Sequence, residues 1–112
     1  GVDAIYVSGH GARQLDSLPA PITQLPKIRK AVGKSFPLIF DTGVRNGEDI
    51  VKAYASGADF VMLGRPVLYA LGADGERGLK TIMNYISKEI QVTLAQIGLA
   101  KISEVNEKNL IR

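Results

Sequence analysis

The chain has 112 residues, enough for one small domain, and its formal net charge of +3 is too small and too scattered to indicate a nucleic-acid partner. It contains no cysteine, which excludes disulfides and cysteine nucleophiles, and with a single histidine we expect no metal site. No apolar run approaches the roughly 18 residues of a membrane-spanning helix, so we expect no transmembrane segment in this chain.

The first predicted strand, residues 4–7, is followed at once by a loop that holds the only histidine. His10 stands between two glycines, which let the backbone approach a ligand closely, and it can take up a proton near neutral pH. Three residues later, Arg13 offers a planar guanidinium that binds a carboxylate through two hydrogen bonds. A base beside such a group suits chemistry at the carbon next to an acid group, and a surface turn with a solvated arginine is the alternative.

The second predicted strand, residues 38–40, leads into another loop with polar and small residues. Asp41 stands at the end of this strand, where it can accept hydrogen bonds from ligand hydroxyls. The glycines that follow, together with Arg45 and a helix start, can cradle an anion. An ordinary strand-to-helix turn is the alternative interpretation of this loop.

The third predicted strand, residues 60–63, is followed by Gly64 and Arg65, just before a helix start marked by Pro66. In eight-stranded barrels, the loops after the last two strands commonly bind phosphate. If the second and third strands are the last two of such a barrel, Arg45 and Arg65 converge on one phosphate. A turn with an exposed arginine is the alternative.

Apolar residues at three-and-four spacing predict four helices, over residues 23–32, 47–56, 66–71 and 79–97. Thr23 and Asn46 are the predicted N-caps of the first two, and Gly57 and Gly98 are predicted to end the second and the last. Residues 74–76 predict a turn and a helix start. We expect two further residues of the last helix to be packing residues, Met83 and Tyr85.

The alternation of strands and helices predicts an α/β fold with parallel strands, in which all three strand-to-helix loops lie at the same end of the sheet. The strands are short apolar runs, which is typical of strands covered on both faces. Three strands cannot close a (β/α)8 TIM barrel. The chain is therefore either a small open sheet or the last three strands of a barrel, with flanking helices and a long C-terminal helix.

Three motifs in order resemble the FMN-dependent 2-hydroxy acid dehydrogenase and oxidase family. The family signature S-N-H-G-(G/A)-R-Q-(L/V)-D appears as SGHGARQLD at residues 8–16. The motif D-(G/S)-G-(V/I/F)-R-(R/N)-G appears as DTGVRNG at residues 41–47. The segment ALASGAD appears as AYASGAD at residues 53–59, and LGRP follows at residues 63–66. The resemblance covers essentially the whole chain and identifies residues 1–112 as the C-terminal portion of such a barrel.

The resemblance implies FMN as the cofactor and oxidation of a small L-2-hydroxy acid, of the lactate or glycolate type, to the 2-keto acid. It makes His10 the active-site base, in contact with the substrate, and Arg13 the ligand of the substrate carboxylate. It assigns the remaining matched residues to the flavin: Ser8 at its ring, Asp41 at the ribityl chain, and Thr42, Gly43, Val44, Arg45, Gly64 and Arg65 at the phosphate.

The chain departs from the family pattern at two positions. Gly9 replaces the asparagine beside the histidine, and Thr42 stands where the family prefers glycine or serine. The family's flavin-facing lysine, the aspartate partner of the histidine and two active-site tyrosines come from earlier barrel strands, and we expect them upstream of Gly1. The isolated chain is therefore expected to be inactive.

Two alternatives stay open beside the flavoenzyme. One is a non-catalytic half-barrel that self-associates through its exposed strand edges or binds a phosphate ligand. The other is a different phosphate-binding barrel, such as an isomerase of the inosine-phosphate or isopentenyl type, which lacks the histidine loop. Whole family members usually assemble into tetramers or larger, so we also expect a homo-oligomer.

The start of the chain indicates a piece cut from a longer protein, because it has no initiator Met and opens at the edge of a predicted strand. It also lacks the basic start and apolar stretch of a signal peptide. Together with the absence of cysteine, this favours a cytoplasmic protein, and peripheral membrane association of the parent enzyme stays open.

Overall fold

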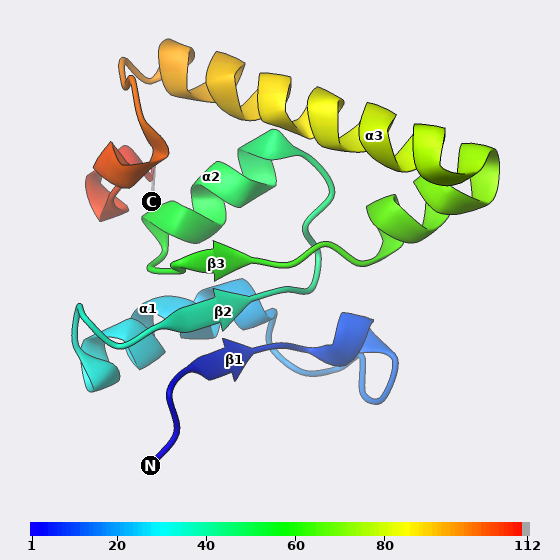
Figure 1. Cartoon of the computed structure of the whole chain (residues 1–112). Coiled ribbons are helices and arrows are strands. Elements are labelled where there is room, and N and C mark those ends of the chain that lie inside the picture. The colour runs from blue at the N-terminus through cyan, green and yellow to red at the C-terminus, as the bar shows by residue number, and fades with distance from the viewer. Residues whose placement is uncertain (111–112) are drawn as a thin grey trace.

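The computed structural model describes residues 1–110. Its elements alternate between strands and helices, as predicted: β1 (Ile5–Val7), the 3-10 helix η1 (His10–Ala12), α1 (Pro21–Val32), β2 (Leu38–Phe40), α2 (Gly47–Ala55), β3 (Phe60–Val61), α3 (Arg65–Gln96), and the short 3-10 helices η2 (Ile102–Glu104) and η3 (Glu107–Asn109) (Figure 1). The three predicted strands are all present, although β1 and β3 are shorter than their apolar runs.

The strands form one parallel sheet in the order β1-β2-β3. Ile5 pairs with Leu38, and Phe40 pairs with both Val7 and Val61. Because parallel strands share a direction, their carboxyl ends lie at one edge, and the prediction that the three following loops lie at the same end is confirmed (Figure 1).

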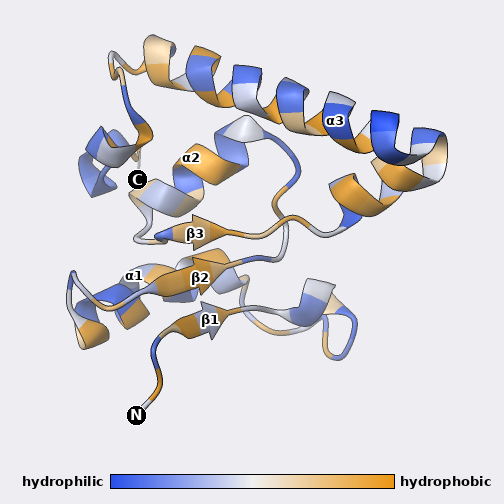
Figure 2. Ribbon diagram, viewed as in Figure 1, coloured by the Kyte–Doolittle hydropathy of each residue, from blue (hydrophilic) through white to orange (hydrophobic). Residues whose placement is uncertain are grey.

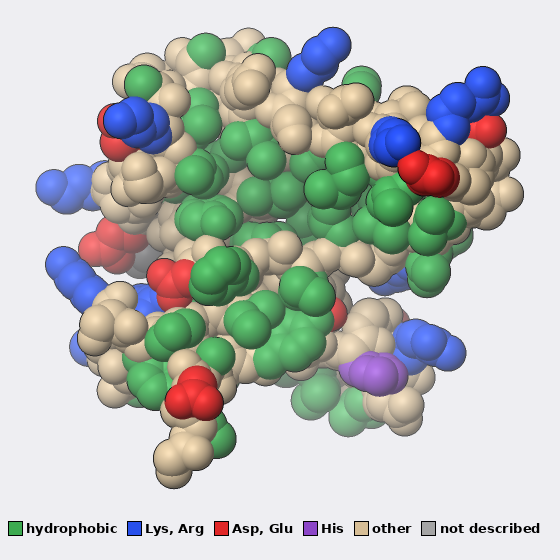
Figure 3. All heavy atoms as spheres, in the orientation of Figure 1, with side chains coloured by type: hydrophobic (Ala, Val, Ile, Leu, Met, Phe, Trp, Pro, Cys, Tyr) green, Lys and Arg blue, Asp and Glu red, His purple; other side chains and the backbone are tan. Residues whose placement is uncertain are grey.

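The helices cover only one face of this sheet. Val7 and Phe40 point to the covered face and are 7% and 2% exposed, whereas Tyr6 and Phe60 point to the other face and are 51% and 60% exposed. Figure 3, which views the sheet from the side away from α1, shows hydrophobic side chains gathered over the strands. The expectation that these strands are covered on both faces is wrong for this chain, because a short apolar run does not reveal whether its second face has a partner.

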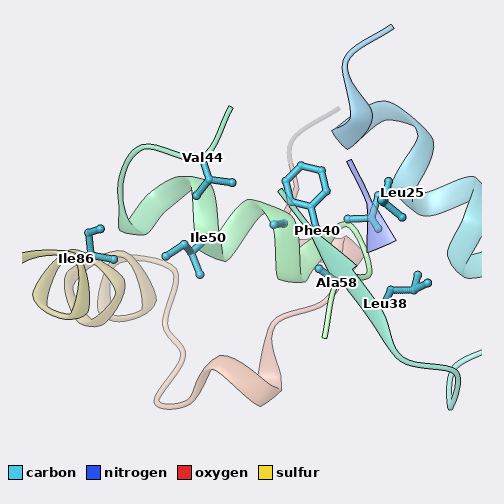
Figure 4. Packing of buried hydrophobic residues seen from close by; sticks show 9 residues of the cluster. Leu25, Leu38, Phe40, Val44, Ile50, Ala58 and Ile86 are labelled. Atoms are coloured by element: carbon cyan, nitrogen blue, oxygen red, sulfur yellow. The ribbon is translucent and has the colours of Figure 1, made fainter. Parts of the chain in front are cut away.

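The core lies between the sheet and the helices. Leu25 of α1 and Leu38 of β2 are fully buried, and Phe40 lies beside them (Figure 4). On the other side of the core, Ile86 of α3 points toward Ile50 of α2 (Figure 4). Colouring by hydropathy shows apolar strands and alternating polar and apolar turns along α3 (Figure 2). This one-sided core fixes the strand ends that carry the predicted site residues.

The two predicted N-caps have different outcomes. Asn46 caps α2, since its side-chain oxygen accepts a hydrogen bond from the backbone N–H of Asp49 at 2.9 Å. Thr23 is not an N-cap, because α1 begins two residues earlier at Pro21 and the Thr23 hydroxyl donates to the Ala20 carbonyl at 2.7 Å. Proline suits the first turn of a helix, where its missing N–H is not needed, and this lets α1 start before the threonine.

The two predicted C-terminal helices are joined into α3 by a kink. Asp74 and Gly75 have non-helical backbone angles, with φ of −155° and 51°, so the predicted turn lies at this kink. Met83 and Tyr85 are 45% and 60% exposed, and the expectation that they pack is wrong. The face of α3 that packs on the core runs through side chains spaced four residues apart, of which the second and fourth are buried and the others partly buried: Ile82, Ile86, Ile90 and Leu94. No helix within residues 1–110 is long and apolar enough to cross a membrane.

A single arginine ties α1 to the loops at the opposite end of the sheet from the site. The guanidinium of Arg29 donates to the carbonyls of Gly57 at 2.9 Å and of Phe36 at 2.8 Å, and it pairs with Asp59 at 2.5 Å. The Asp59 carboxylate also accepts from the backbone N–H of Leu38. This network holds the start of β2 to the loop that precedes β3.

We expect Arg29→Met to lower the free energy of unfolding by about 2 kcal/mol, because the carbonyls and the carboxylate lose a shared donor. Urea denaturation of the chain measures this. Arg77→Met is the matched control: its pair with Asp74 is exposed, so a loss of about 0.5 kcal/mol or less is expected. Equal losses in the two variants would contradict the structural role of Arg29.

Candidate active site

The loops after the three strands enclose a cavity of about 240 Å³ at the carboxyl edge of the sheet. It brings together most of the residues that the sequence singled out, and its lining also includes residues that the sequence did not predict. The lining residues are Gly11, Arg13, Asp41, Thr42, Gly43, Val44, Arg45, Met62, Gly64, Arg65 and Leu68. Arginines from all three loops therefore reach one cavity.

The loop after β1 makes a left-handed turn at the histidine. His10, Gly11 and Ala12 have φ of 50°, 65° and 63°. For a residue with a side chain this region costs roughly 1–2 kcal/mol, so other contacts must hold the turn. His10 is exposed and lies outside the lining of the cavity. The loop thus presents the histidine beside the arginine cavity rather than within it.

Ser8 lies on the other side of this loop. Its hydroxyl accepts a hydrogen bond from the backbone N–H of His10 at 3.0 Å. It lines a second, larger groove of about 760 Å³ between β1, its loop and the start of α1, with apolar residues such as Leu15, Leu18 and Pro21. Ser8 and the three arginines therefore face two neighbouring hollows, which meet at Thr42 and Gly43.

Asp41, at the end of β2, is held by two hydroxyl groups. The Tyr6 phenol donates to Asp41 Oδ2 at 2.8 Å, and the Thr42 hydroxyl donates to Oδ1 at 2.9 Å. Partial burial and this hydrogen bond to Asp41 raise the pKa of Tyr6 above its ordinary value. Tyr6 was missed by the sequence reasoning, which treated it as part of an apolar strand. Its place between Ile5 and Val7 was the available signal, since alternate residues of a strand point to opposite faces.

One end of the cavity combines open backbone with guanidinium groups that lie outside any ion pair of the described residues. No ion pair within residues 1–110 involves the guanidinium of Arg13, Arg45 or Arg65. At Gly43 and Gly64, a Cβ atom would meet nothing within 4 Å, so the backbone there is open to a ligand. Such a combination of glycine backbone and unpaired arginines suits a phosphate or a carboxylate.

Val44 belongs mainly to the core. Its side chain is 3% exposed and packs in the cluster with Ile50 and Phe40, although the residue also lines the cavity. The backbone N–H of the next residue, Arg45, donates to the carboxylate of Asp49 at 2.9 Å. This hydrogen bond ties the loop to the first turn of α2. The Arg45 guanidinium lines the cavity and donates a hydrogen bond to the Val44 carbonyl at 3.1 Å.

A family model described as FMN-dependent dehydrogenase matches residues 1–112. The chain belongs to this family. Its relatives in the family include a peroxisomal (S)-2-hydroxyacid oxidase of Arabidopsis thaliana, 44% identical over 98% of this chain and 30% of that protein. An L-lactate oxidase of Lentilactobacillus hilgardii is 41% identical over 99% of this chain and 30% of its own length. The chain thus spans about 30% of the length of the family members that it matches.

Solved structures of the family have the same fold over this chain. The membrane-associated (S)-mandelate dehydrogenase of Pseudomonas putida, solved as a soluble mutant, superposes with a TM-score of 0.93 and 40% identity, over 97% of this chain and 31% of that one. A mandelate oxidase variant with a monooxide FMN adduct gives a TM-score of 0.88 at 35% identity. The three parallel strands and their helices therefore match part of a TIM-barrel-type flavoenzyme, as predicted.

FMN is the cofactor of the family, and the residues present here fit its phosphate. The cavity offers the open backbone of Gly43 and Gly64 and the unpaired guanidinium groups of Arg45 and Arg65. These groups suit the binding of a dianion, whereas the apolar groove beside Ser8 suits a larger, less polar part of a ligand. The recognition of the family from sequence motifs is confirmed.

Proposed function

We propose that this chain is the closing section of an FMN-dependent barrel that oxidises a small L-2-hydroxy acid, of the lactate or glycolate type, to the 2-keto acid. The observation that carries the proposal is the convergence of arginines from three successive strand-to-helix loops on one cavity, beside the only histidine. Relatives that oxidise hydroxy acids support the general reaction.

Bound FMN would supply the acceptor for a hydride equivalent, two electrons and one proton, that leaves the hydroxy acid, and the second proton goes to His10. His10 takes up a proton from the substrate, and its exposed place beside the cavity leaves the imidazole accessible to it. Arg13, on the same loop, binds the substrate carboxylate through its planar guanidinium. The three-residue separation puts the base and the carboxylate ligand on one turn of chain, next to the carbon that reacts.

The flavin contacts in this proposal are those that the family motifs imply, and the residues line the two neighbouring hollows. Arg45 and Arg65 bind the phosphate, together with the backbone of Thr42, Gly43, Val44 and Gly64. Asp41, which is oriented by Tyr6 and Thr42, accepts hydrogen bonds from the ribityl hydroxyls. Ser8 lies against the flavin ring at the larger groove.

The phosphate site is tested by adding FMN to the 112-residue chain and following flavin fluorescence, with riboflavin as the ligand that lacks the phosphate. We expect the chain to quench the fluorescence of FMN but not that of riboflavin. We also expect Arg65→Met to weaken FMN binding. Arg77→Met, on an exposed part of α3, is the matched control and should bind FMN as the parent does. Equal binding of both flavins, or of neither, would contradict a phosphate site formed by this chain.

Arg13→Met in the complete flavoenzyme should raise KM for the hydroxy acid about 30-fold or more, because a bidentate charge pair to the substrate is lost. Arg13→Lys keeps the positive charge but lacks the planar guanidinium that makes two parallel hydrogen bonds, so an intermediate KM is expected. Steady-state kinetics measure both, with FMN content as the check on folding. An unchanged KM in Arg13→Met would remove the carboxylate role from this residue.

A second candidate function is self-association of the chain as a non-catalytic half-barrel. The observation that favours it is the apolar face of the sheet that no helix covers, where Tyr6, Phe60 and Met62 are 51%, 60% and 52% exposed. Sedimentation velocity of the chain alone tests this candidate. A monomer at all concentrations would exclude it, and a dimer that dissociates on Phe60→Lys would support it.

A further inference from the structure

The left-handed turn at His10 is held by two side-chain hydroxyl groups, which accept hydrogen bonds from three successive backbone N–H groups. The N–H of Gly9 donates to Thr42 Oγ1 at 2.9 Å, and the N–H of Gly11 donates to the same oxygen at 3.3 Å. Between them, the N–H of His10 donates to Ser8 Oγ at 3.0 Å. The amides on both sides of the histidine are thus fixed to one side chain of the neighbouring loop.

The Thr42 hydroxyl uses its full hydrogen-bonding capacity at this point. A hydroxyl has one donor and two acceptor lone pairs. Its hydrogen goes to Asp41 Oδ1 at 2.9 Å, and its lone pairs accept from Gly9 and Gly11. The donation to a carboxylate fixes the orientation of the hydroxyl, so the two amides meet a preset acceptor. Thr42 therefore connects Asp41 to the backbone around His10.

Thr42 also holds a backbone conformation that favours glycine, with φ of 77°. A β-branched residue is rarely found in this region, so its presence indicates that the side chain contributes something that a glycine would not. The hydroxyl contacts to the histidine loop are that contribution. Serine could make the same contacts, whereas valine, which has nearly the same shape, could not.

The two departures from the family motifs are in contact with each other. A Cβ atom at Gly9 would lie 3.3 Å from the methyl carbon of Thr42 and 2.9 Å from Cγ of Pro21. Any side chain at position 9 would therefore push against the threonine methyl and the start of α1. The absence of a side chain at Gly9 leaves room for Thr42 to approach the loop.

We propose that Thr42 is a positioning residue for His10: its hydroxyl fixes the left-handed turn that presents the imidazole, and it couples that turn to Asp41. The proposal rests on the assignment of His10 as the base. Thr42 does not take part in proton transfer itself, and its effect reaches His10 through the amides of Gly9 and Gly11.

The test compares Thr42→Val, which removes the hydroxyl at nearly constant shape, with Thr42→Ser, which keeps the hydroxyl and removes the methyl. Amide hydrogen exchange of the 15N-labelled chain is followed by NMR. In Thr42→Val we expect exchange at Gly9 and Gly11 to be roughly tenfold faster, since each loses its acceptor. In Thr42→Ser exchange should stay near that of the parent.

Two results would overturn the proposal at this stage: unchanged exchange at Gly9 and Gly11 in Thr42→Val, or equal acceleration in both variants. The same variants in the complete flavoenzyme give the second readout. We expect Thr42→Val to lower kcat, expressed per bound FMN, roughly tenfold to a hundredfold, with a much smaller change in KM, and Thr42→Ser to restore it. Unchanged kcat in Thr42→Val, with His10→Gln inactive, would refute the positioning role and leave the proposed function standing.

Discussion

His10→Gln in the complete flavoenzyme is expected to lower kcat by about 10²–10⁴-fold, the range that a positioned acid or base typically contributes. Glutamine has polar atoms of similar reach, but it cannot take up the proton that leaves the substrate. FMN binding should be retained, because His10 is outside the lining of the cavity that holds Arg45 and Arg65. Turnover and flavin content of the purified variant measure the two effects separately.

The control for this variant is His10→Asn. His10 has φ of 50°, a region that asparagine adopts more readily than most residues but in which glutamine is strained. If the loss comes from the missing base, both variants are equally slow. If it comes from a distorted turn, the asparagine variant keeps more activity. Near-normal turnover in either variant would remove the role of base from His10.

The sequence predicted the order of the elements and the gathering of the three loops because both depend on local or general features. Apolar runs such as residues 38–40 mark strands, and three-and-four spacing marks α2 and the C-terminal part of α3. Parallel topology then brings the strand ends together without any knowledge of side-chain packing. The predicted convergence of Arg45 and Arg65 followed from this step together with the common use of the last two loops of eight-stranded barrels to bind phosphate.

Contacts between loops could not be predicted in this way. Thr42 reaches Gly9 and Gly11 across 33 and 31 residues of sequence, and Tyr6 reaches Asp41 across 35. Each contact depends on how far two neighbouring loops extend beyond the sheet relative to each other. The two loops must match to within the length of a hydrogen bond. Gly9 and Thr42 are two separate departures from the family motifs in the sequence. Only the structure shows that the two residues are in contact.

The same limit explains the errors about exposure. Tyr6 and Phe60 belong to apolar runs, and nothing in those runs shows which face of the sheet the helices cover. The proposed barrel offers a physical reason for their composition. In a closed barrel, the face away from the helices is the interior, where apolar side chains are buried by the other strands. The chain spans about 30% of its relatives' length, so this face is open here.

Gly47→Ala should strongly destabilise the packing of α2 against α3. Gly47 is the first residue of α2, where it meets α3 so closely that a Cβ atom would lie 2.5 Å from both Glu89 Cβ and the backbone nitrogen of Ile90. A side-chain rotation cannot relieve a contact with backbone, so α2 and α3 must separate. The separation also weakens the packing of Ile50 against Ile86.

Overpacking of this kind typically costs about 1–3 kcal/mol, and we expect the upper end of that range for Gly47→Ala because the contact is with backbone. For a domain of this size, such a loss lowers Tm by roughly 10–15 °C. Gly72→Ala is the matched control: Gly72 lies in α3 with nothing within 4 Å of its Cβ position, so alanine should stabilise the helix by about 0.5–1 kcal/mol. Thermal unfolding followed by circular dichroism should therefore shift in opposite directions in the two variants. A shift of the same sign and size would mean that α2 and α3 do not pack at Gly47 as the structure places them.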